Sequence, residues 1–194
     1  KKQYYRLLSE FMLQQTQVKT VIPYFNNFVK KIPNLKALSN CSEKKILKLW
    51  EGLGYYKRAK NLHKTSKILI KKYNGKIPNN FLELKELPGI GEYTANILLA
   101  LIYNQPRVGL DGNVKRVLFR LFNFNTHNTE NLFKTKRNDD LAEALMEFGA
   151  LICKSADPKC GECTINKICS YYKSELKIRL KKKVEIKQKS YDIF

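Results

Sequence analysis

The segment Leu87-Pro88-Gly89-Ile90-Gly91 interrupts a chain whose apolar residues otherwise follow helical spacing, and it decides how the helices connect. Glycine adopts positive φ angles without a Cβ clash and lets its backbone approach another surface closely. The apolar run from Tyr93 to Ile102 follows at once and predicts a helix. Free N–H groups at the start of such a helix are suited to bind a phosphate. These features indicate a helix–hairpin–helix turn, although an ordinary helix–helix turn with proline and glycine is the alternative.

Helical spacing of apolar residues continues along most of the chain. It predicts helices around 7–12, 18–28, 46–50, 59–69, 81–84, 93–102 and 114–121. We expect a bend or an opening at Pro23 and a helix cap at Ser42. No stretch alternates with a period of two for long enough to predict a strand. The fold class is therefore all-α, and we expect two helical lobes with short connections.

Polarity and charge mark the boundaries between segments. Residues 123–138 are polar without periodicity and are predicted to form a loop, and from Leu176 the chain becomes lysine-rich. We expect a six-helix domain over 17–122 that contains the hairpin. A second domain would combine 1–16 with 123–175, which hold four clustered cysteines. Residues 176–194 are predicted to be a linker toward a domain outside this chain.

Charge is the strongest compositional signal. The chain has 37 Lys and Arg against 17 Asp and Glu, which gives a formal net charge of +20 and a pI near 9.7. This balance indicates a polyanionic partner, because each cation placed on a phosphate releases condensed counterions. Codon bias would explain why Lys outnumbers Arg, but not why acids are scarce. No run approaches the roughly 20 apolar residues that span a bilayer, so no membrane partner is expected.

Four of the five cysteines are clustered, with the spacing Cys153-x6-Cys160-x2-Cys163-x5-Cys169. Thiolates at these separations can converge on one inorganic centre. A structural zinc site is the alternative, but zinc sites more often use two matched pairs of cysteines. An odd, clustered count also favours a metal site in a reducing compartment over disulfides. We therefore predict a [4Fe–4S] cluster.

The loop between the first two of these cysteines carries Lys154 and Lys159. A cluster that closes this loop into a compact knot would hold both lysines rigidly. We therefore interpret the cluster as a structural support that presents these cations to phosphate, and not as a redox centre.

Two carboxylates have settings that suit catalysis. Glu10 lies in the mostly apolar stretch 8–13, and a carboxyl group in apolar surroundings has a raised pKa and can act as a general acid. Asp111 precedes an amphipathic helix that starts near Val114. On pattern alone, a solvated helix face is the better interpretation of Glu10, and a helix N-cap explains Asp111.

Together these residues resemble the helix–hairpin–helix DNA glycosylases that carry an iron–sulfur cluster, and among them the MutY-type adenine DNA glycosylases. The resemblance covers residues 7–168 approximately. Its most specific stretches are MLQQTQV at 12–18, GLGYY at 52–56 and LDGNVKRV at 110–117. The hairpin and the cysteine spacing add to them.

The resemblance implies a role for each matching residue. Glu10 corresponds to the glutamate that protonates the flipped adenine at N7 and handles the attacking water. Asp111 corresponds to the aspartate that stabilises the oxocarbenium-like sugar, as in glycoside hydrolysis by two carboxyl groups. Tyr93 and Asn113 correspond to active-site residues that support this pair.

The resemblance also implies a DNA-binding surface. Gln15 and Tyr55 correspond to residues that wedge into the base stack beside the lesion, which helps to offset the cost of base flipping. Pro88, Gly89 and Gly91 correspond to the hairpin that holds the DNA backbone without reading its sequence.

Tyr93 separates two branches of this superfamily. The endonuclease III branch has a lysine two residues after the last hairpin glycine, where it forms a Schiff base and cleaves the strand. This chain has Tyr93 there. The resemblance therefore implies a monofunctional glycosylase that removes adenine mispaired with 8-oxoguanine or guanine from double-stranded DNA. An endonuclease III-like glycosylase of other base specificity and a non-catalytic DNA-binding module are the alternatives.

The family's 8-oxoguanine-reading domain would follow residues 181–194, which resemble the linker into it. We expect a monomer that acts in the bacterial cytoplasm at the nucleoid, or in the nucleus or mitochondrion of a eukaryote.

Overall fold

The computed structural model describes residues 2–123 and 135–174. The predicted linker 176–194 and most of the predicted loop 123–138 therefore lie outside the described residues. The described part is helical throughout and contains no strand, which confirms the all-α fold. Its helices are α1 (Lys2–Leu13), α2 (Val18–Lys31), α3 (Leu35–Ser39), α4 (Glu43–Leu49), α5 (Lys57–Tyr73), α6 (Phe81–Lys85), α7 (Glu92–Tyr103), α8 (Gly112–Phe122), α9 (Asn138–Leu151), the 3₁₀ helix η1 (Asn166–Ile168) and α10 (Ser170–Ser174).

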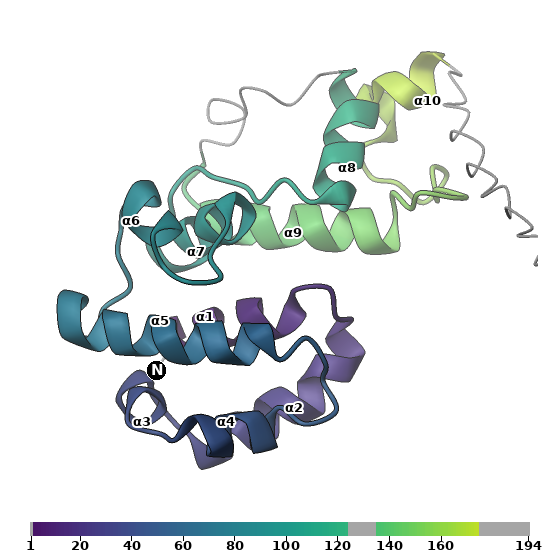
Figure 1. Cartoon of the computed structure of the whole chain (residues 1–194). Coiled ribbons are helices and arrows are strands. Elements are labelled where there is room, and N and C mark those ends of the chain that lie inside the picture. The colour runs from purple at the N-terminus through teal and green to yellow at the C-terminus, as the bar shows by residue number, and fades with distance from the viewer. Residues whose placement is uncertain (1, 124–134, 175–194) are drawn as a thin grey trace, which may run out of the picture.

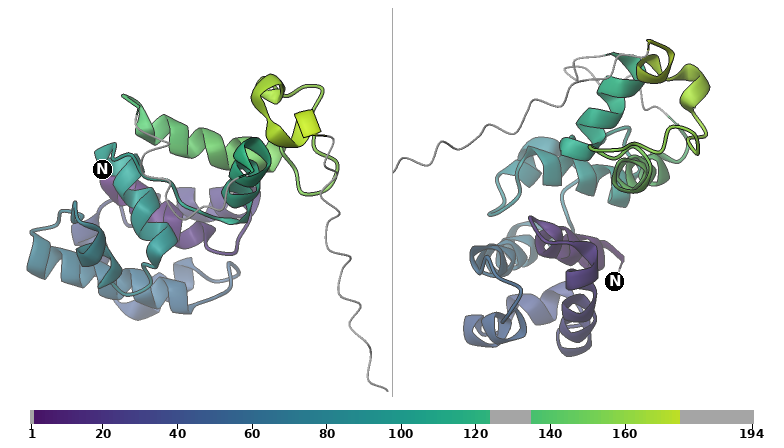
Figure 2. Two further views of the ribbon diagram at one scale, coloured as in Figure 1. Left: turned by 90° about the horizontal axis from the view of Figure 1, so that it is seen from above. Right: turned by 90° about the vertical axis from the view of Figure 1, so that its right-hand side faces the viewer.

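The helices form two stacked lobes, as expected. Figure 1 and the right-hand view of Figure 2 show α1–α5 in one lobe and α7–α10 in the other, with α6 beside α7. Helix α1 packs against α2, α5 and α7, and α9 packs against α7 and α8. The side chain of Arg6 on α1 also pairs with Glu143 on α9. The exact domain boundaries, 17–122 against 1–16 with 123–175, stay a prediction.

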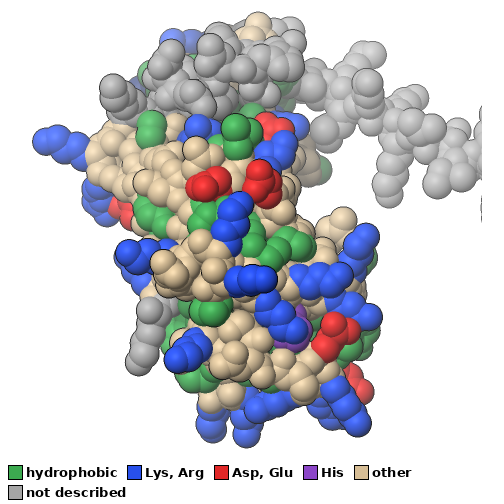
Figure 3. Space-filling view, turned by 60° about the vertical axis from the view of Figure 1, so that its left-hand side comes forward, with side chains coloured by type: hydrophobic (Ala, Val, Ile, Leu, Met, Phe, Trp, Pro, Cys, Tyr) green, Lys and Arg blue, Asp and Glu red, His purple; other side chains and the backbone are tan. Residues whose placement is uncertain are grey.

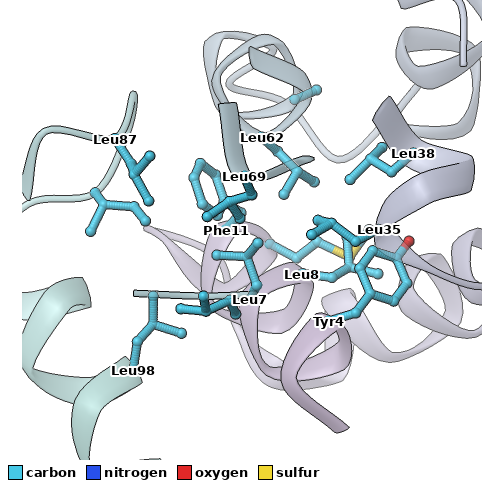
Figure 4. Close-up of a cluster of buried hydrophobic side chains, with 14 of the residues drawn as sticks. Tyr4, Leu7, Leu8, Phe11, Leu35, Leu38, Leu62, Leu69, Leu87 and Leu98 are labelled. Atoms are coloured by element: carbon cyan, nitrogen blue, oxygen red, sulfur yellow. The ribbon is translucent and has the colours of Figure 1, made fainter. Parts of the chain in front are cut away.

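Two clusters of buried apolar side chains form the cores. The first is drawn from α1–α7 and includes Phe11, Phe28 and Trp50, all fully buried. Figure 4 shows part of this cluster around Phe11. The second joins α7, α8 and α9 through Leu101, Val114 and Ala142 among others. Each buried Leu, Phe or Val side chain stabilises the fold by roughly 1.5–3 kcal/mol relative to exposure.

Helix α7 belongs to both cores. Leu98 and Leu99 pack in the first cluster, whereas Ile97, Ala100 and Leu101 pack in the second. A helix that is apolar on all sides has to be buried on all sides. The sequence 97–101 therefore explains why the two lobes are joined along α7.

Capping residues explain where many helices begin and end. Four helices begin at a side-chain oxygen that accepts a backbone N–H two or three residues further on: Asn34, Ser42, Asn80 and Asp111. Three helices end at an asparagine with positive φ, a common left-handed C-terminal residue: Asn74, Asn104 and Asn123. The predicted cap at Ser42 is confirmed.

No helix was predicted where α9, η1 and α10 lie, and two further elements differ from the sequence-based expectation. Helix α2 is one continuous element through Pro23, where we predicted a bend or an opening. Because Pro23 is only the sixth residue of α2, it removes a single hydrogen bond near the start of the helix. The pattern also missed α3, which is too short at five residues to show periodicity.

The predicted hairpin is a tight turn between α6 and α7. Ile90 donates its N–H to the carbonyl of Leu87 at 3.1 Å. Gly89 has φ +82°, and a Cβ atom there would lie 2.8 Å from both Asn61 Cβ and Phe11 Cε1. Glycine is required at this position both by its backbone angle and by the close approach of the first lobe.

Two side chains hold the hairpin against the first lobe. Gln14 Nε2 donates to the carbonyl of Gly89 at 3.1 Å, and Thr65 Oγ1 donates to the carbonyl of Pro88 at 2.8 Å. Both bonds use hairpin carbonyls, and the Ile90 N–H is bonded within the turn, so the N–H groups of Gly89, Gly91 and the start of α7 remain available to a ligand.

Candidate active site and cysteine cluster

A cleft of about 1360 Å³ lies between the two lobes. It is large enough for a nucleoside, since ligand pockets typically measure about 300–1,000 Å³. Seven of the residues singled out from the sequence line it: Glu10, Gln15, Tyr55, Gly91, Tyr93, Asp111 and Asn113. The structure thus brings together side chains that are separated by up to a hundred residues in the chain. Lys154 and Lys159 do not line the cleft and lie on the cysteine loop.

Glu10 lies on α1 and faces the cleft, but only 8% of its surface is exposed. The solvated helix face favoured by its sequence pattern is therefore wrong. Burial raises the pKa of Glu10 from 4.5 to about 7, against a lowering effect of Arg6 and with a smaller raising effect of Glu143. A carboxyl group with this pKa is partly protonated at neutral pH, which suits a general acid.

Asp111 lies opposite, at the start of α8. Its Oδ1 atom accepts the N–H of Val114 at 2.7 Å, so the predicted helix cap is present. The positive end of the helix dipole favours a negatively charged side chain at this position. The same bond fixes the orientation of the carboxylate toward the cleft that it lines.

Tyr93 lies close to both carboxylates. Burial raises the pKa of its phenol, and the negative charges of Glu10 and Asp111 raise it further. The phenol is therefore neutral and can donate a hydrogen bond; in the structure it donates to Met146 Sδ at 3.3 Å. The cleft contains an uncharged donor beside two acidic groups.

Asn113 is held by an arginine that the sequence analysis missed. Arg116 Nη2 donates to Asn113 Oδ1 at 2.9 Å and to the carbonyl of Gly149 at 2.7 Å. Its Nε donates to the carbonyl of Cys153 at 2.9 Å. Arg116 thereby joins the start of α8, the end of α9 and the first cysteine. Nothing in its local sequence distinguishes it from a solvent-exposed cation.

Gln15 and Tyr55 lie at the mouth of the cleft, on two separate turns. Both have left-handed backbone angles, with φ 56° at Gln15 and φ 48° at Tyr55. For residues other than glycine this conformation costs about 1–2 kcal/mol each, and the surrounding structure has to maintain it. The Tyr55 side chain is 62% exposed, which is unusual for a large aromatic residue and suits contact with a partner.

The four clustered cysteines, Cys153, Cys160, Cys163 and Cys169, line a single small pocket between α8, α9 and α10. Burial raises the pKa of the Cys160 thiol, and the other three thiols raise it further, which reflects their proximity. In the described residues, no three His, Cys, Asp or Glu side chains are arranged to hold one metal ion.

Arg120 organises the loop around this pocket. Its Nη2 donates to the carbonyl of Ser155 at 3.0 Å, and its Nη1 donates to that of Lys154. Its own carbonyl accepts the Cys169 thiol at 3.2 Å. Lys154 and Lys159 are exposed, and Lys159 pairs with Glu162 at 3.2 Å. Both lysines are thus accessible to solvent, and their contact with phosphate stays a prediction.

Residues 8–143 match the family model of the HhH-GPD superfamily of base excision DNA repair proteins, and the chain belongs to this family. Curated relatives called adenine DNA glycosylase include one from Buchnera aphidicola subsp. Baizongia pistaciae, 44% identical over 89% of this chain and 52% of the relative. Another, from Homo sapiens, is 34% identical over 84% of this chain and 32% of the relative. The chain spans about half the length of the Buchnera relatives.

Solved structures show the same fold. A thermostable thymine-DNA glycosylase matches with a TM-score of 0.80 and 28% identity, covering 89% of this chain and 85% of that chain. A non-covalent endonuclease III–DNA complex matches with a TM-score of 0.72 and 23% identity, over 88% of this chain and 84% of that chain. Among the described helices, none is long and apolar enough to cross a membrane.

The burial of Glu10 predicts a pH-dependent stability difference for Glu10→Gln. Between pH 4.5 and 7 the folded protein binds more protons at this site than the unfolded chain, so wild-type stability falls as pH rises through that window. Glutamine has no charge to bury. The variant should match wild type below pH 4.5 and be more stable by about 3 kcal/mol above pH 7.

Urea denaturation at pH 4 and pH 8 measures this difference. The control is Glu86→Gln, which removes an exposed carboxylate paired with Lys72 and should change stability by no more than about 1 kcal/mol at either pH. A Glu10→Gln variant that is no more stable than wild type at pH 8 would contradict the burial of a raised-pKa carboxyl group.

Proposed function

We propose that the chain is the glycosylase part of a base excision repair enzyme that hydrolyses the N-glycosidic bond of adenine mispaired with 8-oxoguanine or guanine. The observation that carries the proposal is the placement of two carboxyl groups in one cleft: Glu10, whose pKa is raised by burial, and Asp111, which caps α8. Its adenine specificity is supported by the names of the relatives. The partner is double-stranded DNA, and the chain acts as a monomer in a bacterial cytoplasm, or in a eukaryotic nucleus or mitochondrion.

The two carboxyl groups divide the chemistry between them. Protonated Glu10 gives its proton to N7 of adenine, and the bond between C1′ and N9 breaks with its electron pair leaving on the base. Ionised Asp111 stabilises the positive charge that develops on the sugar. Water then bonds to C1′ and returns a proton to Glu10, which completes a hydrolysis without any other reactant. Tyr93 and Asn113 position the pair.

The base has to leave the duplex to reach this cleft, because both carboxyl groups lie below its mouth. Gln15 and Tyr55 wedge into the space in the base stack and offset part of the few kcal/mol that flipping costs. The hairpin residues Gly89 and Gly91 offer backbone N–H groups to a phosphate, and Pro88, which has no backbone N–H, restricts the backbone angle of the turn. DNA binding and excision would thus use different residues, since the hairpin precedes α7 whereas Glu10 lies on α1 and Asp111 at the start of α8.

Tyr93 supports a monofunctional reaction. Strand cleavage through a Schiff base requires an amine, and the side chain two residues after Gly91 is a neutral phenol. For the identity of the excised base there is a specific alternative. The 28% identity to a thymine-DNA glycosylase makes a different mismatch specificity the second candidate. A non-catalytic module is disfavoured because burial of Glu10 destabilises the fold at neutral pH without an evident structural benefit.

The cysteine quartet is proposed to hold a [4Fe–4S] cluster. Four thiols that line one pocket fit a group in which each thiolate binds a different iron, and their spacing in the sequence lacks the two matched pairs common in zinc sites. The cluster would link α9 to α10 and stiffen the loop that presents Lys154 and Lys159. Both lysines would then contact phosphate.

Excision can be tested with a duplex in which adenine lies opposite 8-oxoguanine. We expect strand breaks only after hot alkali, because the product is an abasic site in an intact strand. Glu10→Gln should lower the single-turnover rate constant by about 100-fold or more, the usual contribution of a general acid, with little change in DNA affinity. Glu86→Gln serves as the control with wild-type activity.

Three outcomes would contradict this account. Cleavage without alkali would show lyase activity, and excision of thymine from a G:T duplex in place of adenine would establish the second candidate. Retained activity in Glu10→Gln would remove the acid assignment.

The cluster can be tested by iron and sulfide analysis. Protein purified without air should contain about four irons per chain, and Cys163→Ala should lose most of them. Cys41→Ala is the matched control, because Cys41 packs at the edge of the first core and is remote from the quartet in sequence. Stoichiometric zinc in wild type, or full iron content in Cys163→Ala, would refute the proposed cluster.

A further inference from the structure

Arg58, the second residue of α5, has an unusual environment for an arginine of a lysine-rich helix. Only 7% of its surface is exposed, and its guanidinium group donates hydrogen bonds to backbone carbonyls. Its Nη1 donates to Met12 at 2.7 Å and to Gln14, and its Nη2 donates to Leu53 and Gly54, both at 3.2 Å. One guanidinium group thus binds two turns that lie about forty residues apart in the chain.

The charge of Arg58 is stabilised from both sides. The carbonyls at the end of α1 form the negative end of a helix dipole, which favours a cation. The guanidinium carbon also lies 5.6 Å from the ring centre of Trp50 and 5.3 Å from that of Tyr55. Lysine could not replace this arrangement, because it lacks the planar fork with donors on two nitrogens that reach both turns.

The position of these bonds in the two turns is informative. The carbonyls of Gln14 and Gly54 directly precede Gln15 and Tyr55, the two left-handed residues at the mouth of the cleft. Arg58 therefore fixes the peptide group before each of them. The φ angle of each of these two residues determines where its side chain points. In both cases the peptide plane from which this angle is measured is held by the Arg58 guanidinium group.

We propose that Arg58 is a positioning residue that couples these two turns into one wedge, so that Gln15 and Tyr55 enter the base stack together. This inference deepens the proposed function and rests on it. Its consequence is that Arg58 acts on base flipping and the subsequent rate of excision, and not on the initial binding of the duplex, which the hairpin, Lys154 and Lys159 provide.

The test compares Arg58→Lys and Arg58→Met with wild type. Lys67→Met is the matched control, because it removes an exposed charge from the same helix without contacting either turn. Hydrogen exchange should accelerate at residues 14–17 and 53–57 in both Arg58 variants and in neither segment of the control. The single-turnover rate constant for adenine excision should fall by about 10- to 100-fold, the effect of a small displacement at a reacting site, while duplex affinity changes little.

Base flipping is measured separately with a duplex that carries 2-aminopurine in place of the target adenine. Its fluorescence rise on binding wild type should be lost with both Arg58 variants. In addition, Gln15→Ala and Tyr55→Ala should combine non-additively in the wild-type background and additively with Arg58→Lys. If Arg58→Met does not fold, Arg58→Lys, which keeps the charge, carries the test alone.

Faster exchange at only one of the two turns would overturn the proposal, as would normal flipping by a folded Arg58→Lys protein. Wild-type protein that binds the duplex but excises no adenine would instead refute the proposed function. In that case the exchange measurements still decide whether Arg58 couples the two turns, so the two failures are distinguishable.

Discussion

Helix α7 is packed on opposite sides by two cores, since Leu98 and Leu99 contact the first lobe while Ile97 and Leu101 contact the second. Burial on all sides fixes this helix in place. The hairpin at its start and Tyr93 in its first turn therefore have fixed positions relative to both lobes. The cleft is lined from both lobes, with Glu10 on α1 of one and Asp111 at the start of α8 of the other. Each carboxyl group acquires its environment from the lobe that carries it.

In the proposed function, DNA binding and base excision depend on different features of the molecule. On the face shown in Figure 3, Lys and Arg side chains outnumber acidic ones. Such a surface attracts a polyanion but does not by itself select a substrate. In the proposed function, selection requires a flipped base to fit a cleft that contains a buried acid, a helix-capping carboxyl group and a neutral phenol. Arg58 and Arg116 hold residues of the cleft in position, because each donates hydrogen bonds to backbone carbonyls of other elements.

Local chemistry explains what could be predicted from the sequence. The hairpin glycines, the Ser42 cap and the cysteine spacing each depend on a few neighbouring residues. The pattern misjudged Glu10, because whether a polar residue on an apolar helix is buried depends on α9 and on the other lobe. It also missed Arg58 and Arg116, whose partners lie tens of residues away. A buried arginine that binds carbonyls has no sequence signature that separates it from a solvated one.

The central claim is that Glu10 keeps its proton to near-neutral pH while facing Asp111. A carbon-13 NMR titration of protein labelled at glutamate carboxyl carbons, assigned by comparison with Glu10→Gln, measures this directly. The account predicts one glutamate resonance that titrates at a pH of about 7 and disappears in the variant. Titration of the Glu10 resonance near 4.5, its ordinary value, would contradict the account.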